Sequence, residues 1–216
     1  MNKISLRKII IISFLISMSL IMEFIITKPI FGHSCQNSLI KLELLPLLLI
    51  GFFFGFKYSI LSNFLFVLIH IILESPHIFQ GSNLLQEINH DKTLITLIIG
   101  ILLFLFIIPY IVCSLTGLFR SSNSNNLCKN KDIVNSLLLI TVIQIISYAV
   151  FSFVFYPKIN SNHILEHIFH DHDDRGNIAI FLYFFVSIII TNLIISICIF
   201  FIKKFVKENE IFYFNL

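Results

Sequence analysis

Long apolar stretches separated by short polar segments dominate the chain. The first covers residues 9–26, and further stretches begin near Leu44, Thr93, Ile133 and Ile178. A helix needs about 20 apolar residues to cross the hydrocarbon core of a bilayer. Because each stretch reaches roughly that length, the pattern predicts transmembrane helices that pack side by side.

Six helices fit these stretches. The run from about Leu44 to Leu73 is too long for one straight span, and Gly55-Phe56-Lys57-Tyr58 interrupts it once. We therefore divide it there into two helices joined by a tight turn. We expect Pro109 to kink the fourth helix. The predicted helices cover about 9–27, 38–56, 58–74, 93–118, 133–156 and 178–206 of a single transmembrane domain, residues 1–216.

The basic residues favour six helices over five, the alternative in which Leu44–Leu73 forms one helix. With six helices and both termini in the cytoplasm, ten basic residues are cytoplasmic: Lys3, Arg7, Lys8, Lys57, Arg120, Lys129, Lys131, Lys203, Lys204 and Lys207. Five are external: Lys28, Lys41, Lys92, Lys158 and Arg175. Positive residues gather on the cytoplasmic side of membrane proteins. The sequence thus predicts an all-α membrane protein, a bundle of six transmembrane helices with a cytoplasmic N-terminus and C-terminus.

Composition agrees with a protein embedded in the lipid bilayer. Of the 216 residues, 57% are hydrophobic and 12% are charged, whereas soluble domains are about 25% charged. Disordered chains are excluded as well, because they combine low hydrophobicity with high charge. The first apolar run exceeds the 7–15 residues of a signal-peptide core, so we expect it to be retained as the first helix.

Several catalytic motifs do not occur in the sequence. A Walker A loop is absent, as are Gly-x-Ser-x-Gly and His-Glu-x-x-His, which carry two common protease chemistries. We therefore expect neither an enzyme nor a nucleic-acid partner. The remaining classes are a small permease and the membrane subunit of a larger assembly.

Two short motifs carry a family resemblance. Glu43 precedes Leu45-Pro46, and Gly51-x-x-x-Gly55-x-Lys57 follows, a spacing that lets a neighbouring helix approach closely. Together with Thr116-Gly117-Leu118-Phe119-Arg120 and the six-helix layout, this segment resembles the S-components of energy-coupling factor (ECF) vitamin transporters, closest in layout to thiamine-type members.

The resemblance implies a function and a set of partners. Such a subunit binds a vitamin or similar micronutrient outside a bacterial plasma membrane and docks on a shared ECF transmembrane subunit with two ATPase subunits. ATP is then used by the partners, and this chain binds no cofactor. S-components typically present Ala-x-x-x-Ala on the first helix for docking. Here Ser13 and Ser17 hold those positions and are also small.

Polar residues inside apolar spans mark a candidate pocket. Gln144, Tyr148, Ser152 and Tyr156 follow at intervals of four and form one stripe on the fifth helix. The sixth helix offers Tyr183, Ser187, Thr191, Asn192 and Ser196. We expect a pocket in the outer half of the bundle, under the loop Lys28–Lys41, with the substrate-binding residues Gln144, Tyr148, Tyr156, Asn192, His33 and Asn37. Hydrogen bonding between helices is the alternative role for these polar residues.

The same stripe argues against thiamine as the substrate. Gln144, Tyr148 and Tyr156 stand where thiamine-type members have a basic residue, His and Trp. Their acidic residue in the fourth helix has no counterpart, because Ile101–Pro109 is apolar throughout. A cationic ring would need that carboxylate, so the substrate stays open.

A histidine-rich segment supports an alternative function. His163, His167 and His170 are spaced so that they share one face on a helical turn. Imidazole and nearby carboxylates suit zinc, nickel or cobalt. The protein would then be a stand-alone divalent-cation permease with an external His-rich loop. The other interpretations are a solvated acidic loop and a structural membrane subunit without a ligand.

Overall fold

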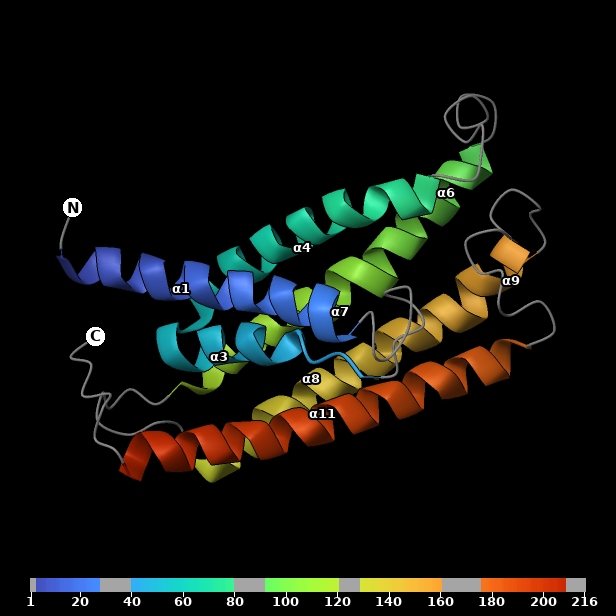
Figure 1. The fold of residues 1–216 in the computed structure, drawn as a ribbon. Coiled ribbons are helices and arrows are strands. Elements are labelled where there is room, and N and C mark those ends of the chain that lie inside the picture. The colour runs from blue at the N-terminus through green and yellow to red at the C-terminus, as the bar shows by residue number, and fades with distance from the viewer. Residues whose placement is uncertain (1–2, 28–39, 80–91, 121–128, 161–175, 209–216) are drawn as a thin grey trace.

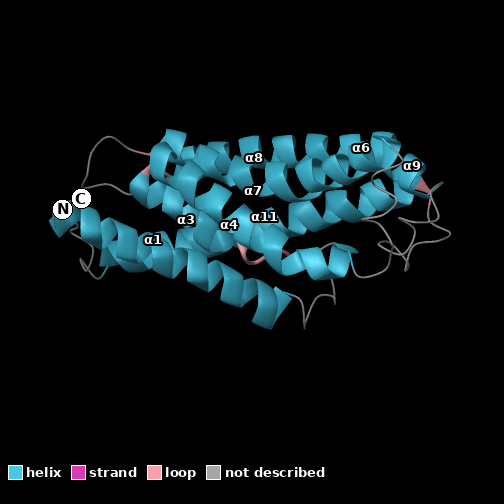
Figure 2. Ribbon diagram, turned by 90° about the horizontal axis from the view of Figure 1, so that it is seen from above, coloured by secondary structure: helices cyan, strands magenta, loops and turns pink. Residues whose placement is uncertain are grey.

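The computed structural model describes residues 3–27, 40–79, 92–120, 129–160 and 176–208, and every regular element there is a helix (Figure 2). The π and 3₁₀ segments are labelled η. The elements are α1 (Lys3–Ile21), η1 (Met22–Thr27), α3 (Leu44–Phe54), α4 (Phe56–Phe79), α6 (Lys92–Ile101), η2 (Leu102–Ile107), α7 (Ile108–Ile111), η3 (Val112–Phe119), α8 (Asn130–Val150), η4 (Phe151–Phe155), α9 (Tyr156–Asn160) and α11 (Asn177–Glu208).

Five helices in the described ranges are long and apolar enough to cross a membrane. They span Leu6–Thr27, Phe56–Leu73, Ile95–Phe119, Asn130–Lys158 and Asn177–Phe205. Their outer faces carry large apolar side chains such as Leu61, Ile72 and Phe201, each more than two-thirds exposed. An exposed apolar surface of this kind is costly in water and suits lipid. The prediction of an all-α membrane protein is confirmed.

The second predicted helix is wrong in length. A helix was expected over 38–56, but α3 has 11 residues, about 16 Å, roughly half the hydrocarbon core. Residues 40–43 are not helical. The backbone N–H of Lys41 donates to Thr191 of α11 at 3.1 Å, and Glu43 is buried among side chains from other elements. These tertiary contacts hold the chain out of helical geometry until Leu44.

The single-helix alternative over Leu44–Leu73 is also excluded. Gly55 has φ of +86°, a left-handed conformation that favours glycine, and it separates α3 from α4. The other five predicted helices are present, each extending beyond its expected range at one or both ends.

Successive helices run in opposite directions along the bundle. In Figure 1, α1, α4 and α8 run from left to right, whereas α3, the continuous helix α6–η3 and α11 run from right to left. Both described ends of the chain therefore lie at the same end of the bundle. The helix α3 begins near mid-length, beside the end of η1, so it covers only one half.

Prolines explain the irregular helical turns. Each of the three π segments ends two residues before a proline in the sequence: η1 before Pro29, η2 before Pro109 and η4 before Pro157. A proline lacks the N–H for the helical ladder, and its ring collides with the carbonyl four residues earlier. Widening the preceding turn relieves that collision. Near Pro109 the chain thus changes from π-helical to α-helical geometry without a break in the helix.

The two motifs behind the family resemblance meet in space. A Cβ added to Gly51 of α3 would lie 1.9 Å from Thr116 Oγ1, and one added to Gly117 would lie 2.3 Å from the backbone nitrogen of Phe56. The Thr116 hydroxyl donates to the Leu48 carbonyl at 3.1 Å. The predicted close helix approach is confirmed for Gly51, and its partner is the 3₁₀ segment η3.

Candidate binding site

A cavity opens where the two buried apolar clusters of the bundle meet, at the start of α3 and between α8 and α11. One cluster surrounds α3 and the other surrounds Phe151 and Phe184. The cavity is lined by Lys41, Leu44, Pro109, Tyr110, Gln144, Tyr148, Phe184, Ser187, Ile188 and Thr191. Its free volume of about 10 Å³ suffices for about one water molecule. A larger ligand therefore requires side chains to move.

Among the described residues that line the cavity, Lys41 is the one charged residue. Its ammonium donates to the Tyr148 hydroxyl at 3.1 Å. The ammonium also lies 5.6 Å from the ring centroid of Tyr148 and 5.9 Å from that of Tyr110, within cation–π range. Because the Lys41 backbone is tied to Thr191, the cation is held between α7, α8 and α11.

The Gln144 amide lies in the wall of the cavity, and Asn192 supports it. Gln144, 2% exposed, donates from Nε2 to the Pro109 carbonyl at 3.0 Å. Asn192 lies one layer behind the wall, where its Nδ2 donates to Gln144 Oε1 at 3.0 Å and to Thr141 Oγ1 at 2.8 Å. These hydrogen bonds fix the orientation of the Gln144 and Asn192 amides within a buried polar network.

Stacked aromatic rings also line the cavity. The rings of Tyr148 and Phe184 lie 4.7 Å apart at an interplanar angle of 14°. Phe151 meets Phe184 edge to face at 6.2 Å and braces the stack from behind. A flat apolar surface next to polar groups suits a planar ligand.

An acidic group lies behind Tyr110, outside the cavity lining. The carboxylate of Glu43 accepts from Thr27 Oγ1 at 3.0 Å and from the Tyr110 hydroxyl at 3.3 Å. The Ser19 hydroxyl donates to the Glu43 backbone carbonyl at 2.5 Å. Glu43 thus joins the inner face of α1 and η1 to the start of α3.

A second buried ionisable pair supports the same region. Glu23 Oε1 of η1 lies 2.7 Å from His70 Nδ1 of α4, and both side chains are no more than 1% exposed. The His70 ring packs against Phe66, Phe106 and Tyr110 at centroid distances of 5.3–5.8 Å. An intramembrane pair of this kind is costly to break and fixes helices relative to one another.

The structure brings some of the predicted site residues together. Gln144 and Tyr148 line the cavity, and Asn192 supports Gln144. Tyr156 is buried in the apolar cluster with Leu97 and Ile101 and does not line the cavity. The predicted polar stripe of α8 does face inward, because all of its members are buried.

Other predictions fall outside the described residues. His33 and Asn37 lie there, as do the candidate metal ligands His163, His167 and His170. Within the described ranges, no group of three or more His, Cys, Asp or Glu residues could hold a metal ion. Those predictions stay predictions.

Sequence reasoning missed Lys41, Tyr110 and Glu43. Hydropathy placed Lys41 and Glu43 at the outer end of a full span, where charged residues are commonplace. The pattern Lys-x-Glu directly before the apolar run that contains Pro46 could have indicated these residues. Two opposite charges so close to an apolar segment are costly unless each has a partner inside the bundle.

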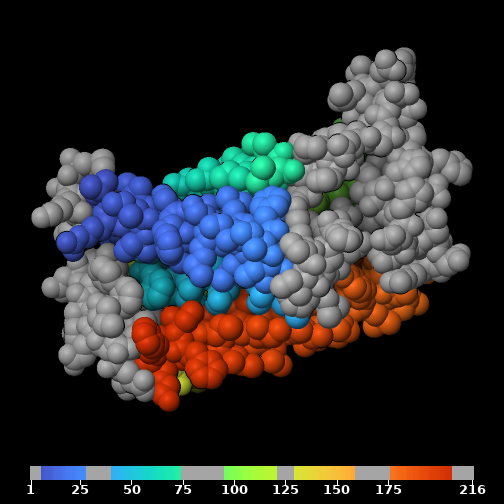
Figure 3. Space-filling model, viewed as in Figure 1, coloured from blue at the N-terminus to red at the C-terminus, as the bar shows by residue number. Residues whose placement is uncertain are grey.

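The docking candidates lie on a different face. Ser13 and Ser17 are exposed on α1, whereas Ser19, Glu23 and Thr27 of the same helix are buried against α3 and α4. Figure 3 shows α1 at the surface of the bundle, above α11.

The chain matches no family model, no curated protein sequence and no solved structure.

Proposed function

We propose that this protein is the substrate-binding S-component of an ECF-type transporter for a vitamin or similar micronutrient in a bacterial plasma membrane. The cavity beside Lys41 is the observation that carries the proposal. It combines apolar and aromatic walls with a few convergent polar groups, the usual make-up of a small-molecule site. The sequence lacks a Walker A loop, so ATP hydrolysis is assigned to partner subunits.

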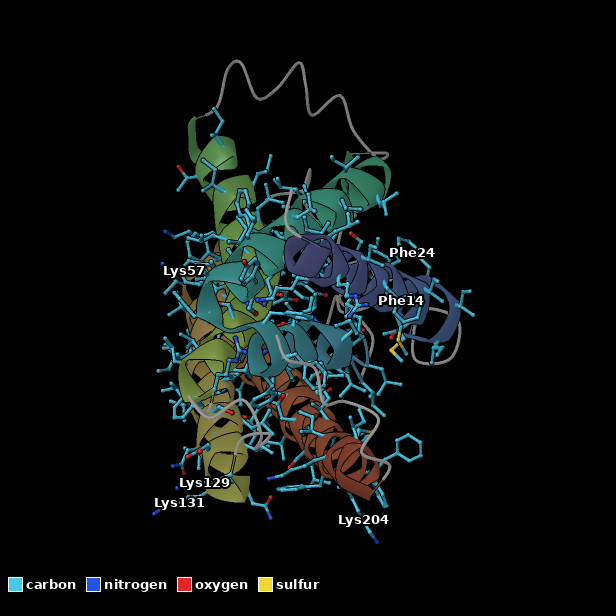
Figure 4. All side chains as sticks on the ribbon, turned by 90° about the vertical axis from the view of Figure 1, so that its left-hand side faces the viewer. Phe14, Phe24, Lys57, Lys129, Lys131 and Lys204 are labelled. Atoms are coloured by element: carbon cyan, nitrogen blue, oxygen red, sulfur yellow. The ribbon has the colours of Figure 1, made fainter. Side chains whose placement is uncertain are left out.

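The distribution of basic residues supports a cytoplasmic location for both termini. Figure 4 looks onto the end of the bundle that carries the chain ends, and exposed Lys57, Lys129, Lys131 and Lys204 gather there. By the positive-inside rule this end is cytoplasmic. Because α3 begins near mid-length of the bundle and ends at that end, where α4 starts, the chain is proposed to form six helices with the N-terminus and C-terminus inside.

The outer face of α1 is the proposed docking surface for the shared subunit. Ser13 and Ser17 lie beside large apolar side chains, among them Phe14, which is 65% exposed, and Phe24 (Figure 4). Small residues let a second helix approach the backbone, and the flanking rings add contact area. This arrangement favours a helix of another subunit over lipid alone.

Co-purification from native membranes tests the proposal. The tagged wild-type protein, extracted in mild detergent, is expected to carry a membrane subunit and two ATPases. The double variant Ser13→Leu/Ser17→Leu should lose these partners, because leucine inserts bulk where the backbones meet. Ala179→Leu, also at an exposed position in a span, is the matched control and should retain them. A wild-type protein that purifies alone, with ATP-independent uptake in cells, would refute the function.

A further inference from the structure

Three basic side chains from different elements meet at the turn between α3 and α4. Lys57 belongs to the first turn of α4. The ammonium of Lys8, from α1, lies 5.8 Å from the ring centroid of Tyr58. Arg120, which follows η3, lies against Gly55, since a Cβ added to that glycine would be 3.5 Å from Arg120 Cδ and Nη1. We call Lys8, Lys57 and Arg120 the turn cations.

The positive charge at this turn is not balanced by the protein. Among the residues that the structure describes, no carboxylate forms an ion pair with any of the turn cations. Glu43 is buried at the opposite end of α3, and Glu23 is paired with His70. Like charges held close together repel one another, so the arrangement favours a bound anion.

An anion at the surface can reach the turn cations, and their chemistry suits a phosphate. Lys57 and Arg120 are exposed, and Lys8 is half-buried. The planar guanidinium of Arg120 can donate to two phosphate oxygens at once, and the two lysines add point charges. The contacts with Tyr58 and Gly55 restrict two of the three side chains before a ligand binds, which lowers the entropic cost of binding.

An apolar stripe on α4 continues directly from Lys57. Its members are exposed and share one face of the helix with Lys57: Leu61, Phe64, Leu65, Leu68 and Ile72. From Lys57 to Leu68 the helix rises about 16 Å, roughly half of the hydrocarbon core and thus the depth of one leaflet. The surface therefore fits an occupant with a negative group at one end and a long apolar part behind it.

We propose that this surface binds one anionic phospholipid of the cytoplasmic leaflet. Its phosphate lies among the turn cations, and its acyl chains lie along the stripe on α4. An acidic segment of a partner protein would match the cations but leave the adjoining apolar stripe without an occupant. The inference goes beyond the proposed function, because it involves neither the cavity nor the docking positions Ser13 and Ser17.

The same end of the bundle provides a matched control. Lys129, Lys131 and Lys204 are also exposed there, and Figure 4 shows them apart from Lys57. We call these three the distal cations. A general attraction between basic residues and anionic membrane surfaces predicts the same effect for both sets. A site at the turn predicts an effect for the turn cations alone.

Native mass spectrometry of the purified, delipidated full chain tests the inference. The protein is titrated with phosphatidylglycerol or with phosphatidylcholine of identical acyl chains, and the affinity for the first bound lipid is compared. Because each basic residue near an anionic headgroup contributes about fivefold, the wild-type protein should prefer phosphatidylglycerol by at least about tenfold. Replacing all turn cations should abolish the preference, and replacing all distal cations should preserve it. The two variants are Lys8→Gln/Lys57→Gln/Arg120→Gln and Lys129→Gln/Lys131→Gln/Lys204→Gln.

A soluble headgroup separates a lipid site from a phosphate site. Glycerol 3-phosphate carries the phosphate without acyl chains, so it should not displace bound phosphatidylglycerol at about 10 mM, where even a millimolar complex would form. Displacement would show that the stripe on α4 takes no part in binding and would overturn the inference.

Three further outcomes would also overturn it. These are equal wild-type affinity for the two lipids, an unchanged preference after loss of the turn cations, and an equal loss of preference in both triple variants. If the turn variant does not fold, the single replacements decide, since each should reduce the preference about fivefold. Loss of co-purifying proteins from the turn variant, without any lipid preference in the wild type, would assign the turn cations to an acidic protein partner instead.

Discussion

Replacing Gly51 by alanine tests the close contact between α3 and η3. The new Cβ would lie 1.9 Å from Thr116 Oγ1 and 2.9 Å from the Gly117 backbone nitrogen. The hydroxyl can rotate away only by losing its hydrogen bond to Leu48, and the backbone can move only by separating the two segments. Overpacking of this kind costs about 1–3 kcal/mol. Alanine regains about 1 kcal/mol through its higher helix propensity, so the net loss is about 0–2 kcal/mol.

The assay is the midpoint of thermal unfolding in detergent micelles. For a chain of this size 1 kcal/mol corresponds to about 2–4 °C, so Gly51→Ala should lower the midpoint by up to roughly 8 °C. Gly176→Ala is the matched control, because its added Cβ meets nothing within 4 Å, and its effect should stay within about 0.5 kcal/mol. Adding Thr116→Ala to Gly51→Ala removes the nearest colliding atom and should recover part of the loss. A midpoint for Gly51→Ala above that of the wild type would show that α3 and η3 are not in close contact.

Two further predictions concern the orientation and the buried ionisable pair. In a cysteine-free background, Lys158→Cys should react in intact cells with a membrane-impermeant maleimide and Lys129→Cys should not, as the positive-inside rule requires; the reverse pattern would invert the orientation. Replacing either Glu23 or His70 by leucine should lower the free energy of unfolding by about 3 kcal/mol or more, because the other ionisable side chain stays buried after the ion pair is broken. The double replacement should cost less than the sum of the two, and additive losses would argue against direct coupling.

The sequence predicted those features of the fold that depend on the solvent or on neighbouring residues in the chain. Helices that contact lipid must be long and apolar, so hydropathy located the membrane spans. Gly55 ends α3 because few other residues adopt its positive φ. Likewise, the interval of four residues on α8 placed Gln144 and Tyr148 on the inner face. In each case the relevant interaction is with the solvent or with neighbouring residues in the chain.

Long-range partners account for what the sequence did not reveal. Lys41 contacts residues 107 and 150 positions away, and Glu43 contacts Tyr110 at a separation of 67. No local pattern encodes such pairings, so the start of α3 was predicted too early, at residue 38 instead of Leu44. Tyr156 belongs to the same stripe but is buried in the apolar cluster with Leu97 and Ile101 and does not line the cavity.

The short length of α3 explains why charged residues lie next to the cavity. A helix that spans the bilayer fully would carry Lys41 and Glu43 to the surface, whereas α3 begins near mid-length of the bundle (Figure 1). A charged side chain at the centre of a membrane helix costs about 3 kcal/mol on insertion scales. Each charge therefore requires partners: the Tyr148 hydroxyl and the rings of Tyr110 and Tyr148 for the ammonium, and the hydroxyls of Thr27 and Tyr110 for the carboxylate. Those partners come from η1, α7 and α8. The polar groups that lower the cost of the two charges are thus the same ones that connect the cavity to the inner face of the first helix.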